Sequence, residues 1–586
     1  MTAPGAGTPT DAPTGLVARS ATGLLRVWNE AGVLEPADVH VADRCGDLAG
    51  EPDEQARLAL ALLVRAARGG STCLDPAAVP AAALELATPE PVSWLRALRQ
   101  SPLCGPGLPM RVDGGLLYLD RYWQEETQVC SDLLAREAGP PPAVDLARAR
   151  AAAERLIPLG DDPEASEVQR SATVNAALRW TTVLAGGPGT GKTTTVAKLL
   201  AVLADQPGRP PRVALAAPTG KAAARLTEAA TAEIATMSED DHRRVGAPTA
   251  STLHRLLGYR PGSRTRFRHD RDNRLPHDVV VVDEASMVSL TMMARLLEAL
   301  RPDARLVLVG DPDQLASVEA GAVLADLVAG LRARHRDDPG GSVVQLRRVW
   351  RFGGAIADLA QAVREADADT ALAILAGGDE HVAFGETGVR QDVVAAAAGI
   401  AAAAERGDGE AALLAMESHR LVCGHRSGPD GVTDWTRRIT GWLAEDAGLV
   451  ADGDWYVGRP LLITQNDYTI GLFNGDTGVV VRAADGSLRA VFRRDGDLVD
   501  FAPSRLAAVQ TVHAMTVHRS QGSQFVRVTV ALPTLESPLL TRELLYTGLT
   551  RARELVRVIG SPEQVRAAIA TPAARATGLR DRLVRT

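Results

Sequence analysis

The run Gly186-Gly187-Pro188-Gly189-Thr190-Gly191-Lys192-Thr193 constrains the fold of this chain more than any other feature. It fits G-x-x-x-x-G-K-[ST], a loop whose glycines let successive backbone N–H groups face one anion. The apolar run Thr182–Ala185 before it predicts a buried strand, and Thr194–Leu203 after it has the apolar spacing of a helix. This context indicates a phosphate-binding loop for a nucleoside triphosphate. The alternative, a chance glycine-rich turn, is disfavoured because the pattern and its context agree.

Two segments near this loop carry further chemistry. We expect Lys192 to neutralise the β- and γ-phosphates and the Thr193 hydroxyl to bind Mg²⁺. Asp283 and Glu284 close the run Val279–Val282, where a carboxylate suits the Mg²⁺ shell and its neighbour can accept a proton from the attacking water. A surface acidic pair is the alternative.

Later residues can complete the same site. Gln314 follows the apolar run Leu306–Val309, from where it can hydrogen-bond a γ-phosphate or its water; a plain turn rich in Gly, Asp and Pro is the alternative. Arg351 and Arg551 lie far downstream, and an arginine from a second domain can stabilise transition-state charge. Taken alone, either arginine is better explained as a solvated or ion-paired side chain.

The length and the composition bound the remaining possibilities. A chain of 586 residues predicts roughly three to five domains. The net charge of −8 means that any nucleic-acid surface must be a local patch. The five cysteines are scattered without a C-x-x-C pair, so a disulfide framework or a zinc site is disfavoured. No apolar run reaches about 18 residues, and we expect a cytoplasmic protein without a membrane span.

Composition shifts divide the chain. We expect a disordered tail at 1–14, a helical domain at 15–135 and a Pro-rich linker at 136–165. The fold class is α/β, because continuous apolar runs joined by helices predict parallel sheets covered on both faces. The predicted strands of the first α/β domain (166–346) are Thr182–Ala185, Val213–Ala216, Val279–Val282 and Leu306–Val309. Those of the second (347–586) are Leu421–Val422, Leu461–Ile463, Val526–Ala531 and Val556–Ile559. Closely spaced turns predict a small β-barrel inserted at 468–508.

Small polar residues follow several predicted strands and suit sequence-independent contacts to a nucleic-acid backbone. These candidates are Pro218, Thr219, Lys221, Thr252, His254, Thr516, His518 and Arg519. The segment 259–276 adds six arginines around Phe267 and predicts a basic hairpin that contacts a single strand and stacks on bases. A solvated basic loop is the alternative.

Taken in order, these segments resemble the motifs of superfamily 1 helicases. The resemblance runs from Gln169, at the place of an adenine-reading glutamine, through A-P-T-G-K-A-A-A-R-L, V-V-D-E-A-S-M, V-G-D-P-D-Q-L and W-R-F to Y-T-G-L-T-R-A-R, which ends at Arg553. Within that superfamily the chain is similar to the RecD family, the α subunits of exodeoxyribonuclease V (RecBCD). This closer resemblance rests on segments outside the ATPase motifs, at 117–126, 428–432 and 458–478.

The resemblance implies two RecA-like P-loop motor domains, a Src-homology-3-like barrel in the second, and an N-terminal domain that docks on a partner. It implies an ATP-dependent 5′-to-3′ DNA helicase that acts with RecB-like and RecC-like subunits on single-stranded DNA and duplex ends, in the repair of double-strand breaks by recombination. The nuclease centre would lie in a partner subunit. The implied ATP site comprises Gln169, Gly186, Gly187, Pro188, Gly189, Thr190, Gly191, Lys192, Thr193, Asp283, Glu284, Gln314, Arg351 and Arg551.

Three positions depart from the family pattern. Arg519 and Gln524 stand where the family more often has Lys and Glu, and Gly548 replaces a usual Ala. Two other functions stay open at this point. One is a stand-alone RecD-like 5′-to-3′ helicase, and the other is a structural or regulatory subunit whose ATP site serves assembly.

Overall fold

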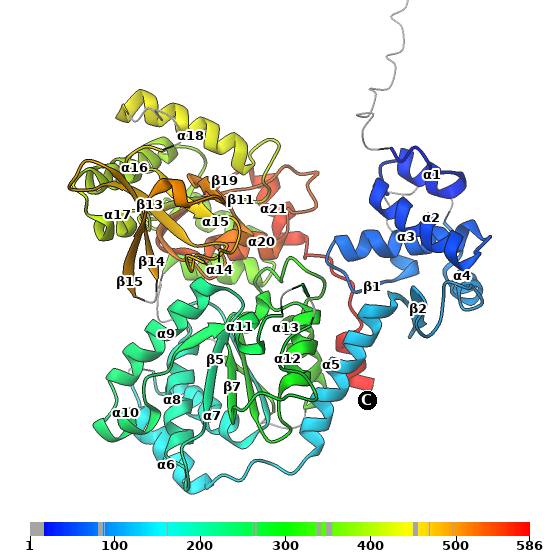
Figure 1. The fold of residues 1–586 in the computed structure, drawn as a ribbon, viewed down its shortest axis with the longest axis horizontal. Helices are drawn as coiled ribbons and strands as arrows, with labels where there is room; N and C mark the ends of the chain where they lie inside the picture. Colours follow the sequence, from blue (N-terminus) through cyan, green and yellow to red (C-terminus); the bar gives the residue numbers. More distant parts are fainter. Residues whose placement is uncertain are drawn as a thin grey trace, which may run out of the picture.

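The computed structural model describes residues 17–79, 86, 88–160, 162–260, 262–263, 266–336, 341–346, 348, 354–448, 455–467, 469–494 and 496–585. Strands in these residues form four sheets: a small antiparallel sheet near the N-terminus, two parallel sheets, and a second antiparallel sheet. In Figure 1 the parallel sheets lie one above the other, and the N-terminal region stands at their side. Residues 146–346 are called the first sheet domain below, and residues 354–570 the second sheet domain.

The N-terminal region is largely helical, as predicted, but it also contains a hairpin. Gly114 and Gly115 both have positive φ and connect two strands in a tight two-residue turn, which explains why no helix continues there. Trp28 and Trp94 are fully buried at its centre. The helices are α1 (Gly23–Glu30), α2 (Pro36–Ala49), α3 (Glu54–Arg68) and α4 (Pro91–Leu98), and the sheet has the order β1 (Cys73–Leu74), β3 (Leu116–Leu119), β2 (Met110–Asp113).

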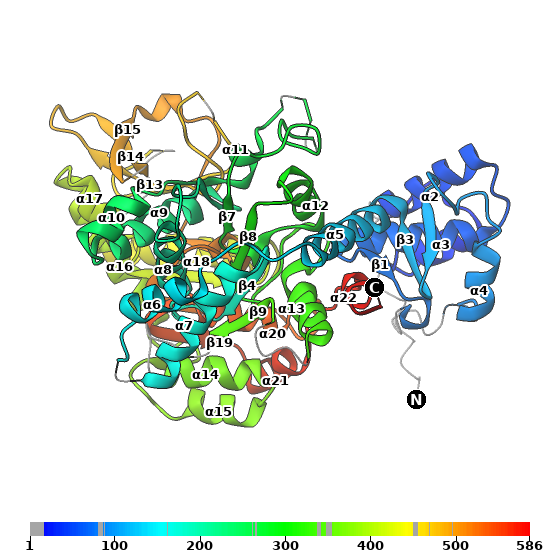
Figure 2. The ribbon, with the colours of Figure 1, turned by 90° about the horizontal axis from the view of Figure 1, so that it is seen from below.

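Helix α5 (Asp120–Ala138) connects this region to the first sheet domain, which Figure 2 shows from below. The side chains of Val129 and Leu133 enter the core of that domain. The buried Arg136 donates to the carbonyl oxygen atoms of Arg301 (3.1 Å) and Trp180 (3.2 Å), and also to that of Ala304. The helix therefore connects the N-terminal region rigidly to the first sheet domain.

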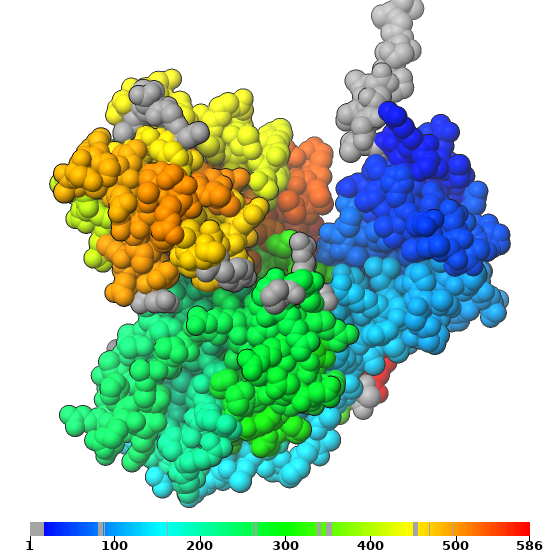
Figure 3. Space-filling model, in the orientation of Figure 1, coloured from blue at the N-terminus to red at the C-terminus, as the bar shows by residue number. Residues whose placement is uncertain are grey.

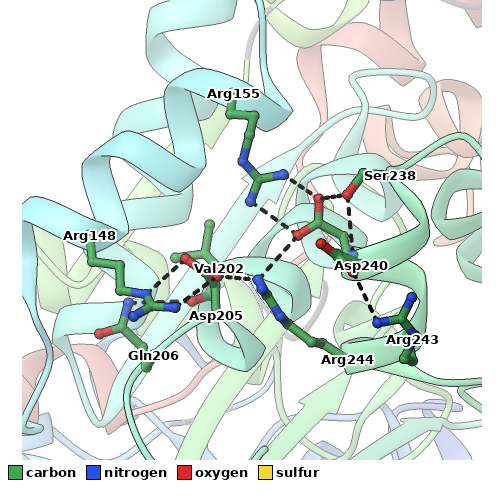
Figure 4. Close-up of polar contacts among 10 residues, drawn as sticks. Arg148, Arg155, Val202, Asp205, Gln206, Ser238, Asp240, Arg243 and Arg244 are labelled. Atoms are coloured by element: carbon green, nitrogen blue, oxygen red, sulfur yellow. Dashed lines mark hydrogen bonds and ion pairs between the residues drawn. The ribbon is translucent and has the colours of Figure 1, made fainter.

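The predicted linker at 136–165 contains an ordered helix, α6 (Leu146–Leu156). Ala149, Ala152 and Ala153 form a small-residue stripe that packs into the core of the first sheet domain. On its outer side Arg148 Nε lies 3.1 Å from Asp205 Oδ2, Arg155 pairs with Asp241, and Arg244 pairs with Asp205 (Figure 4). The stripe and the ion pairs hold α6 in place, and the described residues of the predicted linker that lie outside helices are 139–145, 157–160 and 162.

The first parallel sheet has the order β6-β5-β7-β8-β4-β9, and all four strands predicted for it are confirmed. Val280 and Val282 face one core cluster, whereas Val279 and Val281 face the other, so both faces of the sheet are covered. The strands are β4 (Thr181–Gly186), β5 (Val213–Ala217), β6 (Ala250–Thr252), β7 (Val279–Val282), β8 (Arg305–Gly310) and β9 (Val343–Leu346). The helices are α7 (Pro163–Leu178), α8 (Lys192–Ala204), α9 (Gly220–Ala235), α10 (Glu239–Val245), α11 (Leu253–Leu257), α12 (Leu290–Ala299) and α13 (Val323–Arg334).

The second parallel sheet has the order β10-β19-β18-β11-β17. Its strands are β10 (Val382–Phe384), β11 (His419–Cys423), β17 (Ala514–Thr516), β18 (Phe525–Ala531) and β19 (Ala552–Ile559), so the predictions at Leu421–Val422, Val526–Ala531 and Val556–Ile559 are confirmed. The helices are α14 (Ala355–Arg364), α15 (Ala368–Ala376), α16 (Val389–Glu405), α17 (Gly409–Ala415), α18 (Val432–Ala447), α19 (Val517–Ser520), α20 (Arg542–Leu549) and α21 (Pro562–Ala570).

The prediction that Leu461–Ile463 belongs to the second parallel sheet is wrong. Strand β12 (Pro460–Ile463) pairs antiparallel with β13 (Thr477–Arg482) and β16 (Val509–Thr511). The antiparallel sheet continues through β14 (Leu488–Arg494) and β15 (Asp497–Phe501), so it spans 460–511 rather than 468–508. The strand resembled a parallel one because Leu462 and Ile463 are buried in cores on opposite faces. Figure 3 shows this region stacked on the first sheet domain.

The last residues of the chain leave the second α/β half to which the sequence assigned them. Helix α22 (Leu579–Arg585) packs on α13 and α5, because Leu579 and Leu583 form a buried i, i+4 pair. Before it, the Thr72 backbone N–H donates to the Ala576 carbonyl oxygen at 2.9 Å. The C-terminal segment thus joins the N-terminal region to the first sheet domain.

Candidate functional site

The glycine-rich loop joins β4 to α8 in the predicted context. Gly189 and Gly191 have φ of 80° and 81°, a left-handed conformation that favours glycine. A Cβ atom on Gly186 would lie 2.8 Å from the Leu346 carbonyl oxygen, so only glycine fits there. The Lys192 Nζ donates to the carbonyl oxygen atoms of Gly186 (2.7 Å) and Gly187 (2.8 Å). The lysine charge therefore lies over the loop, with Thr193 beside it at the start of α8.

The acidic pair directly follows β7, on the same edge of the sheet as the loop. Burial and the charge of Glu284 raise the pKa of Asp283, and the charge of Lys192 opposes this rise. Glu284 has a φ of 50° and a ψ of 41°, an unusual conformation for a residue with a side chain. The structure therefore brings together Lys192, Asp283 and Glu284.

Asp311, which was not among the predicted site residues, lies at the end of β8. Its Oδ2 accepts a hydrogen bond from Gln314 Nε2 at 3.1 Å, and its Oδ1 accepts one from the Asp313 N–H at 3.1 Å. Burial raises the pKa of Asp311 to about 6, although the charge of Lys192 lowers it. Asp311 could have been predicted from the sequence, because it lies between Gly310 and Gln314, directly after an apolar run.

The second sheet domain closes over this edge through α20. The Tyr546 hydroxyl donates to Asp311 Oδ2 at 3.0 Å, and the Leu315 N–H donates to Thr547 Oγ1 at 2.9 Å. Gln521 Nε2 also donates to the Leu315 carbonyl oxygen at 2.7 Å. The candidate site is therefore an interface between the two sheet domains.

The predicted arginines have different outcomes. Arg551 is buried at this interface, where its Nε donates to the Thr547 carbonyl oxygen at 3.0 Å and its Nη1 to that of Ser523 at 3.3 Å. Arg351 lies outside the described residues. Arg225 was not predicted, yet its Nη1 crosses from α9 to the Gly522 carbonyl oxygen at 2.7 Å. Burial lowers the pKa of this arginine.

Gln169 lies on α7, the helix that leads into β4 and packs against α8. It is 8% exposed, and its carbonyl oxygen accepts a hydrogen bond from Thr173 Oγ1 at 2.8 Å. The residue is thus placed on an element that contacts the helix of the glycine-rich loop.

The candidate nucleic-acid contacts share one local structure. Thr219, Thr252 and Thr516 each follow or end a parallel strand and cap the next helix, with Oγ1 accepting a backbone N–H at 3.2, 3.2 and 3.3 Å. The edge strands β6 and β17 end in the same sequence, Thr-apolar-His-Arg, at 252–255 and 516–519. These segments form a second group of residues, separate from the contacts around Asp311.

Lys221 and Pro218 flank the first of these threonines. Burial and the charge of Arg225 lower the pKa of Lys221 to about 8. A Cβ atom on the neighbouring Gly220 would lie 3.8 Å from Phe473 Cδ2. The loop before β13 in the antiparallel sheet region thus reaches the candidate DNA contacts of the first sheet domain.

The basic segment 259–276 differs from its prediction. Tyr259 and Phe267 form an antiparallel bridge, which agrees with a hairpin. Phe267 is only 4% exposed and packs in the core beside α11, with its ring centroid 5.7 Å from that of His254, so it is not placed to stack on a base. Arg271 pairs with Asp132 at 2.8 Å, and Arg274 donates to the Leu300 carbonyl oxygen. Arg264 lies outside the described residues.

Two features are absent from the described part of the chain. No helix there is long and apolar enough to cross a membrane. No group of three or more His, Cys, Asp or Glu side chains there could hold a metal ion.

Comparisons with known proteins agree on one family. Residues 30–118 match the N-terminal domain of RecBCD enzyme subunit RecD, residues 169–320 an AAA domain, and residues 511–559 a UvrD-like helicase C-terminal domain. RecBCD enzyme subunit RecD of Mycolicibacterium smegmatis is 55% identical over 568 residues, which cover 94% of this chain and 98% of that protein. The subunit of Mycobacterium tuberculosis is 53% identical over 583 residues, with 97% and 98% covered.

The ATP-dependent RecD2 DNA helicase of Deinococcus radiodurans is 33% identical over 477 residues, which cover 80% of this chain but only 59% of that protein. The match is thus nearly end to end with the two mycobacterial RecBCD subunits and partial with the longer helicase. The two parallel sheets, the loop between β4 and α8 and the helical N-terminal region all agree with the same assignment. This chain belongs to the RecD family of RecBCD enzyme subunits, with helicase domains of the superfamily 1 type.

Proposed function

We propose that this chain is an ATP-driven motor that moves 5′ to 3′ along single-stranded DNA within a complex with RecB-like and RecC-like subunits. In that complex it would unwind duplex ends during the repair of double-strand breaks. The observation that carries the proposal is the closure of the glycine-rich loop region by α20 of the second sheet domain. Since nucleotide would bind at this interface, each round of hydrolysis would change the contact between the two domains.

Each site residue would have a different role in ATP hydrolysis. Lys192 already holds its charge over the loop and would bind the β- and γ-phosphates. Glu284 would take the proton of the attacking water, and Gln314 would contact the γ-phosphate. Gln169 would contact adenine, and Arg551 and Arg351 would add positive charge from the second half of the chain.

The residues at the loop fit a Mg²⁺ ion. In P-loop enzymes Mg²⁺ takes one or two protein ligands and otherwise phosphate oxygen atoms and waters, rather than an all-protein cage. Thr193 at the start of α8 and Asp283 after β7 would hold it. When bound, the ion would neutralise charge on the phosphates.

Both sheet domains would bind the DNA backbone through the capped strand ends. The hydroxyls of Thr219, Thr252 and Thr516 accept a backbone N–H, which leaves each O–H group able to donate to a phosphate. Pro218, Lys221, His254, His518 and Arg519 lie in the same segments. Because the two sets belong to different domains, a change at the nucleotide site would move one set relative to the other.

The remaining regions would serve assembly and support. The N-terminal region, within 15–135, would dock on a partner subunit, and its exposed apolar residues Val41, Leu48 and Val92 would suit such a contact. The antiparallel sheet at 460–511 would correspond to the Src-homology-3-like barrel of the family.

The substitution Lys192→Ala tests the motor function in the assembled complex. We expect a loss of this subunit's ATP hydrolysis and 5′-to-3′ movement of about 100-fold or more, because the charge that stabilises the phosphates is removed. Lys198→Ala on the same helix is the control, since Lys198 contacts Glu233 at 3.5 Å instead of the loop. A strand-polarity assay in which the Lys192→Ala complex moves along the 5′ strand like the wild type would contradict the motor function.

A further inference from the structure

One buried carboxylate receives hydrogen bonds from both sheet domains. Asp311 Oδ2 accepts from the Tyr546 hydroxyl at 3.0 Å and from Gln314 Nε2 at 3.1 Å, while Oδ1 accepts from the Asp313 N–H at 3.1 Å. Asp311 is 1% exposed, Gln314 5% and Tyr546 4%. We call Asp311, Gln314 and Tyr546 the Asp311 latch. Asp311 Oδ2 therefore accepts one hydrogen bond from Gln314 of the first sheet domain and one from Tyr546 of the second.

The latch lies directly against the glycine-rich loop. A Cβ atom on Gly187 would come within 3.0 Å of the Tyr546 hydroxyl and 3.9 Å of Asp311 Oδ2. The next residue of α20, Thr547, accepts the Leu315 N–H at 2.9 Å, so two adjacent residues of this helix hold the segment that carries Gln314. A change in the direction of the Gln314 amide is therefore coupled to α20 through a single carboxylate.

We propose that Tyr546 is a positioning residue that links the sensing of the γ-phosphate to closure of the two sheet domains. The proposal rests on the proposed function, in which Gln314 contacts the γ-phosphate. When the Gln314 amide turns toward a γ-phosphate, Asp311 Oδ2 loses one donor and keeps the Tyr546 hydroxyl. Without that hydroxyl the turn would leave a buried carboxylate oxygen unpaired, which is costly. Tyr546 thus allows the Gln314 amide to turn toward the γ-phosphate of a triphosphate. This turn leaves Tyr546 bonded to Asp311 and so favours the arrangement in which the two sheet domains are in contact.

The substitution Tyr546→Phe tests this link in the full-length chain. The dissociation constants of ADP and of a non-hydrolysable ATP analogue with an imido group between the β- and γ-phosphates are measured with Mg²⁺ present. We expect the wild type to bind the triphosphate analogue more tightly than ADP. The ratio of the ADP dissociation constant to that of the analogue should fall about tenfold in Tyr546→Phe, as for loss of a hydrogen bond to a charged group. A general loss of protein stability would weaken the binding of both nucleotides by a similar factor, and the ratio of their dissociation constants would not change.

Two further variants separate the link from other effects. Tyr456→Phe removes another tyrosine hydroxyl, 3.4 Å from His513 Nε2, and should leave the ratio unchanged. Asp311→Asn should lower the ratio by itself, and adding Tyr546→Phe to it should lower the ratio no further. If Tyr546→Phe does not fold, as judged by thermal unfolding, Asp311→Asn carries the same prediction.

A Tyr546→Phe chain that folds and keeps the wild-type ratio would overturn the proposal. An additive effect of the two substitutions would do the same. A wild-type chain that binds neither nucleotide is a different result, because it contradicts the proposed function itself.

Discussion

The two sheet domains share an architecture but differ at the carboxyl ends of their central strands. In the first, β4, β7 and β8 are followed by the glycine-rich loop, by Asp283 and by Asp311. In the second, β11, β18 and β19 are followed by Gly424, Leu532 and Gly560, none of which has a titratable side chain. The glycine-rich loop and the two carboxylates thus belong to one domain, and the other contributes α20, which contacts this edge through Tyr546 and Thr547.

The edge strands show the opposite relation. Both β6 and β17 end in a threonine that caps a short helix, followed by an apolar residue, His and Arg. Two domains that differ at their central strand ends therefore present the same local structure for the proposed DNA contacts. This comparison predicts two outcomes. Substitutions after the central strands should lower ATP hydrolysis only in the first sheet domain, whereas equivalent substitutions after the edge strands β6 and β17 should weaken DNA binding to a similar extent.

The largest expected effect comes from Glu284→Gln. Removing the proposed proton acceptor should lower the rate of ATP hydrolysis by about 100-fold or more and leave nucleotide affinity nearly unchanged. The amide has the shape of the carboxylate and can keep the backbone at a φ of 50°. Initial rates of phosphate release with saturating single-stranded DNA measure the effect.

Glu554→Gln, at an exposed position of β19, is the matched substitution in the second sheet domain. It should hydrolyse ATP at the wild-type rate. Equal losses in both variants would contradict a specific role of Glu284 as the proton acceptor.

The strands that could be predicted are those whose burial leaves a continuous apolar run. Val279–Val282 is fully buried on both faces of a parallel sheet, and its pattern fits no exposed element. The same reasoning failed at Leu461–Ile463, since a strand between two cores looks alike in either kind of sheet. The edge strand β6 has only three partly exposed residues, Ala250–Thr252, and so left no apolar run to recognise.

The candidate site shows a similar limit. Lys192, Asp283 and Glu284 could be predicted because each lies beside a local pattern that sets its position. Tyr546 belongs to a recognisable segment, but its contact with Asp311 depends on how two domains pack across 235 residues of chain. Phe267 was misread for the same reason, because its position in the core follows from the packing of α11 rather than from its basic neighbours.

The paired substitutions Thr252→Val and Thr516→Val test the common edge structure, with an intermediate expected effect. Each removes a helix cap and a hydroxyl donor, so each should weaken single-stranded DNA binding roughly threefold to tenfold without changing nucleotide affinity. Thr252→Ser and Thr516→Ser keep the hydroxyl and should bind DNA like the wild type. Fluorescence anisotropy with a labelled oligonucleotide is the measurement. If only one of the two valine variants lost affinity, the edges would not be equivalent.

The smallest expected effect is a pH dependence that belongs to the first sheet domain alone. Because burial and Arg225 lower the pKa of Lys221 to about 8, its positive charge is present below that pH and is lost above it, whereas an ordinary lysine stays charged to above about pH 10. Single-stranded DNA affinity should therefore fall by about threefold between about pH 7 and pH 9, the size of one weakened phosphate contact. Bound phosphate favours the charged lysine, which moves the fall toward higher pH. Lys221→Arg keeps its charge throughout this range and should show a flatter profile. Identical profiles for the wild type and Lys221→Arg would show that the charge of Lys221 does not contribute to DNA binding.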